Sequence, residues 1–363
     1  MLATDNRTYI EDIHFETAEE LLKSISYGGD LYKILDENFI FRGHSSDKYR
    51  LLPTALRCRT REIVYPNTFD PDDKLKDSEY GQIDAEARLL FSFYQQCDKT
   101  HLYVPNEKRL QNPISKILSF DYSILLEPEY WIADEYQELA GLAQHHGVPT
   151  RLLDWTSDIN VALYFASSST IKKAATHKKN DKRRMPKEKK LIKERIYNYF
   201  TTHKLEAEAE AEAEAEADGN MELWALDTTI LSVVNKFSMP LKITKPCYHN
   251  NANLAAQKGL FTYWQIKKPL KLQNEKTIAD INKGVCDSPL DLQITEFLEQ
   301  HQVSAEKYIY HITIPHSEAI KLYEYAKRNH CDASFLFPGY GGVARCLEED
   351  GYLKKIKSEL KKE

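Results

Sequence analysis

The sequence predicts an α+β protein, in which helices dominate the first half of the chain and strands the second. Segments rich in β-branched and aromatic residues come late, at residues 221–227, 259–266 and 308–315. The regular alternation of strand and helix that builds a doubly wound sheet is missing, and so is a GxGxxG motif. A nucleotide bound by this chain would therefore not be held in the Rossmann manner. The 363 residues suffice for one large domain or two ordinary ones, and we expect a single domain, residues 1–363.

Caps and apolar periodicity place the helices. Thr17-Ala-Glu-Glu20 is a capping box, which opens a helix whose inner face carries Leu21, Leu22 and Ile25. A loop is expected at residues 66–80, which hold two prolines and many acids. The tail, residues 352–363, has the pattern of an amphipathic, lysine-rich terminal helix. Further helices are expected at about residues 31–37, 83–98, 131–145, 317–328 and 342–349.

A charged segment of low complexity, residues 168–220, interrupts this pattern. It begins with a basic run, residues 171–197, and continues with Ala-Glu repeats at residues 206–217. The repeats place like charges at i and i+4 and have no apolar face, which predicts a solvated helix or spacer inserted into the domain. Two interpretations of the basic run are open: a contact with nucleic acid or another acidic partner, or a solvated linker, which we favour.

The composition excludes several classes of protein. The net charge of −6 gives no general affinity for nucleic acid or membranes. The six cysteines are scattered without CxxC spacing, which indicates reduced thiols in a cytoplasmic protein, and no metal site is expected. Neither a signal peptide nor an apolar run of membrane length is present in this sequence.

Residues 144–166 combine ionisable groups with large apolar side chains on a turn-rich stretch. Leu152, Leu153 and Trp155 stand between the charges. Buried charge is costly unless it is paired or used, so this combination is typical of the wall of a cleft. The polar members of the segment are Gln144, His145, His146, Thr150, Arg151, Asp154 and Thr156.

A helix follows this segment, with Ser157 or Asp158 as its expected N-cap. Its apolar residues recur at i, i+3, i+4 and i+7, which defines one helical face. Residues 154–156 therefore come just before a helix N-terminus, where backbone N–H groups and the helix dipole favour an anion. A phosphate or the edge of a nucleotide would suit this place. The face is formed by Ile159, Ala162, Leu163 and Ala166.

A second segment with chemical character is Phe39-Ile-Phe-Arg-Gly-His44. It is expected to form a strand whose end presents Arg42, while Gly43 lets another group approach closely. Arginine suits bidentate contact with a phosphate or a carboxylate.

Together these segments resemble the FRG domain family, named for the Phe-Arg-Gly that stands here at residues 41–43. The resemblance extends over most of the chain and keeps the family's order. Its elements are Phe41-Arg42-Gly43, Leu52-Pro53-Thr54 with Arg57, Glu86-x-x-Leu-Leu-x-x-Phe93, residues 144–166, Ala256-Gln257-Lys258-Gly259-Leu260-Phe261, and Leu336-Phe337-Pro338 with Gly342.

The family in turn resembles divergent ADP-ribosyltransferases, which cleave NAD at the nicotinamide–ribose bond. That resemblance implies a mixed-sheet core and NAD as substrate. It also implies that Arg42 grips the diphosphate or the nicotinamide ribose. Asp154-Trp155-Thr156, followed by Val161-Ala162-x-x-Phe165, stands where those enzymes carry Ser-Thr-Ser and Val-Ala-x-x-Phe, so Asp154 and Thr156 would shape the nicotinamide pocket.

Those enzymes usually carry a glutamate that bonds the ribose hydroxyl and stabilises an oxocarbenium-like transition state. Here Gln257 occupies the implied position. Glutamine can bond a hydroxyl but brings no charge to a developing cation. Asp154 is then the alternative carboxylate, and Arg42, Asp154 and Gln257 are the candidate catalytic residues.

The remaining site candidates each have a structural alternative. Arg42 or Arg151 could form a buried ion pair with Asp154, and Trp155 could belong to the core. Of the two adjacent histidines we favour His146 as the one that faces the cleft. The candidate NAD-binding residues are Phe41, Gly43, His44, His146, Thr150, Arg151, Trp155, Thr156 and Phe261.

The resemblance implies a transferase that moves ADP-ribose from NAD to a protein or nucleic acid, or that hydrolyses NAD, as a toxin or in defence against phage. A non-catalytic module that binds nucleotides or nucleic acid is the first alternative. A nuclease that uses His146 with Arg42 is the second.

Overall fold

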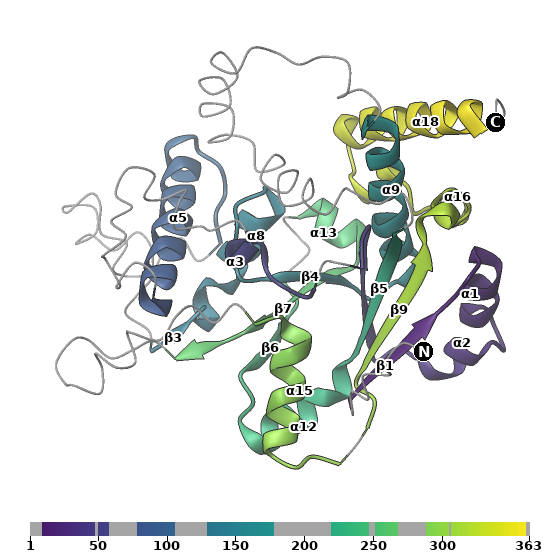
Figure 1. Ribbon diagram of the computed structural model, residues 1–363. Coiled ribbons are helices and arrows are strands. Elements are labelled where there is room, and N and C mark those ends of the chain that lie inside the picture. The colour runs from purple at the N-terminus through teal and green to yellow at the C-terminus, as the bar shows by residue number, and fades with distance from the viewer. Residues whose placement is uncertain are drawn as a thin grey trace.

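A mixed seven-stranded sheet forms the centre of the protein in a computed structural model, which describes residues 9–47, 50–57, 78–105, 129–177, 219–246, 251–267, 288–304 and 306–360 (Figure 1). The strand order is β1-β9-β5-β2-β4-β7-β6. Only the β1–β9 pair of this sheet is parallel. The strands are β1 (Ile10–His14), β2 (Phe39–His44), β4 (Leu153–Thr156), β5 (Asn220–Asp227), β6 (Leu241–Thr244), β7 (Gly259–Trp264) and β9 (Ile309–Pro315), and β3 (Tyr130–Trp131) pairs with β8 (Ile266–Lys267) in a second sheet.

The sheet opens between β2 and β4. β2 pairs with β5 along its full length, and β4 pairs with β7 along its full length. Between β2 and β4, however, the ladder has one pair, Phe41 opposite Thr156. Residues 42–44 and 153–155 therefore have no strand partner on their facing sides, and side chains can enter the gap.

One face of the sheet is covered by α9 (Ile159–His177) and α16 (Ala319–Arg328), which Figure 1 shows beside β5 and β9. The long helix α18 (Tyr340–Leu360) packs on α9, away from the strands. Alternate residues of β5, such as Met221 and Leu223, point into this core, while Glu222 and Trp224 point to the other face. The same core is extended by α1 (Ala18–Ile25), α2 (Asp30–Ile34) and α17 (Ala333–Leu336), with a 3₁₀ turn, η6 (His316–Glu318), before α16.

Two further clusters complete the core. The second face of the sheet packs on α12 (Leu231–Phe237), the turn η4 (Thr228–Ile230) and α15 (Leu290–Gln300). At the β4–β7 side, a separate cluster holds α5 (Glu79–Lys99) and α8 (Gln137–His145). The short elements on this side are α3 (Thr54–Arg57), η2 (Asp134–Tyr136) and α13 (Ala252–Ala256).

Most of the expected elements are present. The Thr17 capping box is confirmed, because the Thr17 hydroxyl accepts from the Glu20 amide and the Glu20 carboxylate accepts from the Thr17 amide. The strand that carries Arg42 and the three late strands are confirmed, as are helices near 31–37, 83–98 and 317–328. The helix expected from residue 131 begins only at Gln137, after β3 and η2.

Four expectations need correction. β1 was not expected, and it adds an edge strand that pairs with β9. Residues 153–156 form a strand instead of a turn. The boundary at residue 168 lies inside α9, which continues to His177 and buries Ser168, Ile171 and Ala175. The helices expected at 342–349 and 352–363 are one helix, α18.

Other expectations fall partly outside the described residues. These are most of the loop at 66–80, residues 178–218 of the insertion, residues 361–363 of the tail, and the cysteines at 58, 247 and 286. Cys97, Cys331 and Cys346 are free thiols. None of the helices in the described part of the chain is long and apolar enough to cross a membrane.

Candidate functional site

A cavity of about 360 Å³ lies where β2 and β4 separate. Its walls come from the end of β2, from β4, from one side of α9, and from the segment that joins α17 to α18. Three guanidinium groups border it, and they belong to Arg42, Arg57 and Arg345. The sequence segments 39–44 and 144–156 thus meet in one cleft, together with Gln257.

Arg42 is fixed in the gap by two hydrogen bonds. Its Nε donates to His44 Nε2 at 2.7 Å, and its Nη1 donates to the backbone carbonyl of Asp154 at 2.7 Å. The Asp154 carboxylate is 3.6 Å from Nη1 and its side chain is 60% exposed, so this ion pair is long and open to solvent. Burial lowers the pKa of Arg42, while Asp154 acts in the opposite direction. The guanidinium stays charged, because arginine is not deprotonated in proteins.

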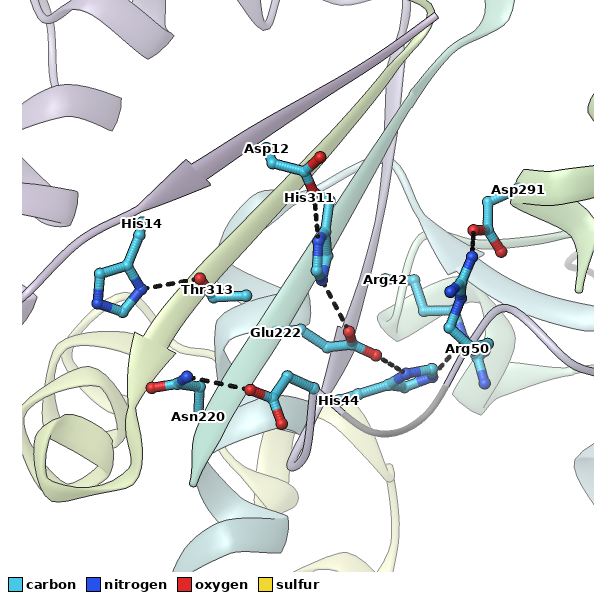
Figure 2. A network of polar contacts seen from close by, with 11 residues as sticks. Asp12, His14, Arg42, His44, Arg50, Asn220, Glu222, Asp291, His311 and Thr313 are labelled. Atoms are coloured by element: carbon cyan, nitrogen blue, oxygen red, sulfur yellow. Dashed lines mark hydrogen bonds and ion pairs between the residues drawn. The ribbon is translucent and has the colours of Figure 1, made fainter. Parts of the chain in front are cut away.

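Behind Arg42, a chain of four polar contacts crosses the sheet (Figure 2). His44 Nδ1 meets Glu222 Oε1 at 2.6 Å, Glu222 Oε2 meets His311 Nε2 at 2.9 Å, and His311 Nδ1 meets Asp12 Oδ1 at 2.9 Å. These residues stand on β2, β5, β9 and β1. We call this chain, from Arg42 to Asp12, the polar relay.

The hydrogen bonds fix the protonation states along the polar relay. Arginine Nε can only donate, so His44 Nε2 must accept, and the ring proton of a neutral His44 lies on Nδ1 and is donated to Glu222. Both nitrogens of His311 face carboxylates, which is the pattern of an imidazolium. The relay therefore alternates in charge, with a neutral imidazole between Arg42 and Glu222.

The pKa shifts agree with this assignment. Burial and the positive charge of Arg42 lower the pKa of His44, which keeps its ring neutral. Burial alone would lower the pKa of His311, but the hydrogen bonds to Glu222 and Asp12 outweigh it and raise that pKa. Burial would raise the pKa of Glu222, yet the two histidines hold it below its ordinary value. Trp224 stacks on the His311 ring at 4.1 Å, which suits a cation.

The opposite wall of the cavity contains Asp154, Thr156 and Gln257. The Thr156 hydroxyl donates to the Gln257 carbonyl at 2.7 Å and accepts from the Asp158 amide at 3.0 Å, so it ties β4 to the chain before β7 and to the start of α9. The Gln257 amide nitrogen donates to the Leu336 carbonyl at 3.1 Å. Of these three residues, Asp154 is the one that brings a carboxylate, and that carboxylate is exposed.

The choice between the two histidines was wrong. His145 lines the cavity, whereas His146 lines a different pocket beside Phe93 and Leu142. α8 ends at His145, and the two rings stand at 86° to each other, so they face different sides. Burial and the neighbouring His146 lower the pKa of His145. Its Nε2 lies 2.8 Å from Asn253 Nδ2.

Arg151 does not reach the cavity, and it does not pair with Asp154. It is buried and bonds two glutamates of α5: its Nε lies 2.8 Å from Glu86 Oε2, and its Nη2 bonds Glu79. Burial would lower the pKa of Arg151, but Glu86 and Glu79 outweigh it and raise that pKa. Arg151 therefore forms a buried structural ion pair, and its partners belong to α5 instead of Asp154.

Three more candidate site residues are buried in the interior of the protein. Thr150 is buried and bonds Gln144, and Phe261 is buried against Gly141. Trp155 borders the cavity, but its ring packs in the second-face cluster and its Nε1 donates to Thr262 at 2.7 Å. Side chains alternate along β4 and β7, so residues next to site residues turn away from the site.

Phe41, Gly43 and His44 do line the cavity. Gly43 has a steric role, because a Cβ there would lie 2.0 Å from the Ala162 carbonyl oxygen. Glycine thus allows α9 to pack directly on β2 beside Arg42. In the described part of the chain, no group of His, Cys, Asp and Glu side chains could hold a metal ion.

Several residues of the site were missed. Glu222, His311 and Asp12 carry no motif, because strand pairing brings them together from distant positions. Six further residues line the cavity but were not assigned to the site. They are His145, Arg57, Phe165, Ser169, Phe337 and Arg345. Arg57, Phe165 and Phe337 stand in the motifs quoted above, and Ser169 follows Phe165 at the helical spacing of four residues.

The chain is thus an α+β protein with an arginine-lined cavity at the split of a mixed sheet. Comparison with family models gives a match to the FRG domain over residues 37–175, which supports the FRG domain family for this part of the chain. No curated protein and no solved structure matches it.

Proposed function

We propose that this protein binds NAD in the cavity and breaks its nicotinamide–ribose bond, passing ADP-ribose to a macromolecule or to water. One observation carries the proposal: Arg42 is held by the polar relay at the split of the sheet, directly beside the exposed carboxylate of Asp154. A fixed cation next to an available anion suits a substrate whose diphosphate is negative and whose ribose becomes positive during the reaction.

The charges support this reading. Arg57 is close enough to Arg42 to lower its pKa, so both guanidiniums act on one small volume. Such a pair attracts a diphosphate. At the other wall, the Asp154 carboxylate would stabilise the ribose as the C1′–nitrogen bond breaks and nicotinamide leaves with the electron pair. The acceptor then bonds C1′ and releases its proton to a base, and His145, which lines the cavity outside the polar relay, is the candidate for that role.

Gln257 has a different role in this proposal. Its side-chain Nε2 donates to the Leu336 carbonyl, and its backbone carbonyl accepts from the Thr156 hydroxyl. We therefore assign it to positioning of the wall, and we assign the acidic role of the usual glutamate to Asp154.

The test incubates purified protein with NAD labelled in the adenine ring, in the presence and absence of cell lysate. Free nicotinamide and transferred label are both measured for the wild type, Arg42→Ala, Asp154→Asn and the control His14→Gln, which lies on the same sheet but outside the relay. We expect release in the wild type and the control, and loss of it in the other two variants. No release from a folded wild type that binds NAD would replace this proposal by the non-catalytic alternative.

The non-catalytic module uses the same cavity and differs only in turnover. The nuclease alternative has lost its basis, because His146 lies outside the cavity that contains Arg42. A role as a toxin or in phage defence, and a cytoplasmic location, would follow from consumption of the host's NAD. If the acceptor is a macromolecule, it is a protein or a nucleic acid, and the basic run contributes Lys172 and Lys173 to α9.

A further inference from the structure

Part of α9 forms a wall of the cavity. Between residues 161 and 171, every side chain is buried except Phe165 and Ser169. These two lie four residues apart, on one helical face, and both line the cavity. An aromatic ring that is left half-buried in an otherwise buried helix is available to a ligand.

Phe337 and Arg345 stand opposite Phe165. The rings of Phe165 and Phe337 meet edge to face, with centroids 6.2 Å apart, and the Arg345 guanidinium lies 4.3 Å from the Phe337 ring centre. We call Phe165, Phe337 and Arg345 the aromatic end of the cavity. Its members come from α9, from the residue after α17, and from α18.

Arg345 is anchored on one side only. Its Nε donates to Glu349 at 3.0 Å, and the buried Glu349 also accepts the hydroxyls of Tyr164 and Tyr323. No residue in the described ranges accepts a hydrogen bond from the two Nη groups of Arg345, and its side chain is 42% exposed. A planar donor with free N–H groups therefore borders a pocket with aromatic walls.

The distance between the two ends of the cavity fits one nucleotide. Ala162 lies against Gly43 and so marks the Arg42 end. Ser169 comes seven residues later on α9, which is about 10 Å along a helix. A diphosphate at the arginines would thus leave an attached ribose and base pointing along α9 towards Phe165.

We infer that the aromatic end is a subsite for the adenine base of the ligand. The base would lie against the Phe165 and Phe337 rings, and Arg345 Nη groups would donate to its ring nitrogens, which are acceptors. The identity of the base rests on the proposed function, since Asp154 takes the nicotinamide side of NAD. Binding of the base itself needs no catalysis and is measured separately.

Calorimetry with ADP and with pyrophosphate, which lacks ribose and base, tests the subsite. In Phe337→Ala we expect affinity for ADP to fall roughly 5- to 150-fold, the range for loss of one base–aromatic contact. Affinity for pyrophosphate should stay unchanged. Phe165→Leu, which keeps the bulk but removes the ring, should act in the same direction. Phe335→Ala is the matched control, because Phe335 is 53% exposed, meets the His330 ring edge to face and does not line the cavity.

The outcomes separate this inference from the proposed function. Selective loss of ADP affinity without nicotinamide release from NAD would keep the subsite and reject the chemistry. Equal loss for ADP and pyrophosphate in folded Phe337→Ala, or no loss for either, would overturn the subsite. It would also be overturned if the wild type bound ADP no better than pyrophosphate. Far-ultraviolet circular dichroism of each variant checks that the fold is retained.

Discussion

Arg42 Nε and His44 Nε2 are joined by a hydrogen bond of 2.7 Å between residues two apart on one strand. Both side chains lie on the same face of β2, because strand side chains alternate. The bond holds the guanidinium towards the split of the sheet, and it requires a neutral His44 with its proton on Nδ1. The orientation of a candidate catalytic arginine therefore depends on a neighbouring histidine and, through it, on Glu222.

The role of His44 predicts that glutamine can replace it and leucine cannot. A glutamine offers an oxygen to Arg42 and an N–H to Glu222, as the imidazole does. In His44→Leu, NAD affinity should fall roughly 10- to 150-fold, as expected for loss of one hydrogen bond to a charged group. His44→Gln should retain most of the affinity. Calorimetry measures both, and an equal loss in the two variants would show that His44 contributes through packing alone.

His311 should make stability depend on pH. Its pKa is raised in the folded protein by Glu222 and Asp12 against the effect of burial. Its contribution is therefore fully present below the unfolded pKa of about 6.5 and is lost as pH rises through the folded value. We expect the difference in unfolding free energy between wild type and His311→Gln to be larger at pH 6 than at pH 8.5, by on the order of 1 kcal/mol. Urea unfolding of the wild type and His311→Gln at the two pH values measures this difference.

Arg151 should matter for stability and not for binding. Arg151→Met leaves Glu86 and Glu79 buried without their cation, which costs about 3–5 kcal/mol. The exposed Lys258–Asp158 pair offers a comparison, and Lys258→Met should cost about 1 kcal/mol or less. Denaturant unfolding gives both values. Below its transition, Arg151→Met should bind NAD like the wild type, and a selective loss of affinity would restore a ligand role for this arginine.

Gly43 and Gly341 should respond in opposite ways to alanine. At Gly43 the new Cβ meets the Ala162 carbonyl oxygen at 2.0 Å, so β2 and α9 must move apart next to Arg42. At Gly341, at the start of α18, nothing lies within 4 Å. Gly341→Ala should stabilise the protein by about 0.5–1 kcal/mol, and Gly43→Ala should lower its melting temperature and its NAD affinity. A neutral Gly43→Ala would contradict the close packing.

Local signals explain which parts of the fold could be predicted from the sequence. The Thr17 capping box and the strands at residues 39–44 and 220–227 are encoded by their own side chains. Residues 153–156 mix charged and apolar residues over only four positions, so their strand was not recognisable without its partner β7. β1 escaped notice for the same reason, because its pairing with β9 joins residues 299 apart.

The candidate site divides in a similar way. Motifs identified Arg42, Gly43 and Asp154, because chemistry at one place requires particular residue types in a short segment. The direction in which adjacent side chains point could not be predicted in the same way. His145 and His146 exchanged roles because the choice depends on where α8 ends. Arg151 has glutamate partners on α5, which the sequence does not place beside it.

The family match covers residues 37–175, which include β2 and β4 but not β5 at 220–227 or β7 at 259–264. A fragment cut at those limits would keep a single backbone pair between its two strands of the main sheet, since their full ladders are formed with β5 and β7. It would also lose Glu222, His311 and Asp12, and with them the support of Arg42. The unit that is recognisable by sequence is therefore smaller than the unit that can fold, and expression of the excised segment would yield strands with open edges in place of a working domain.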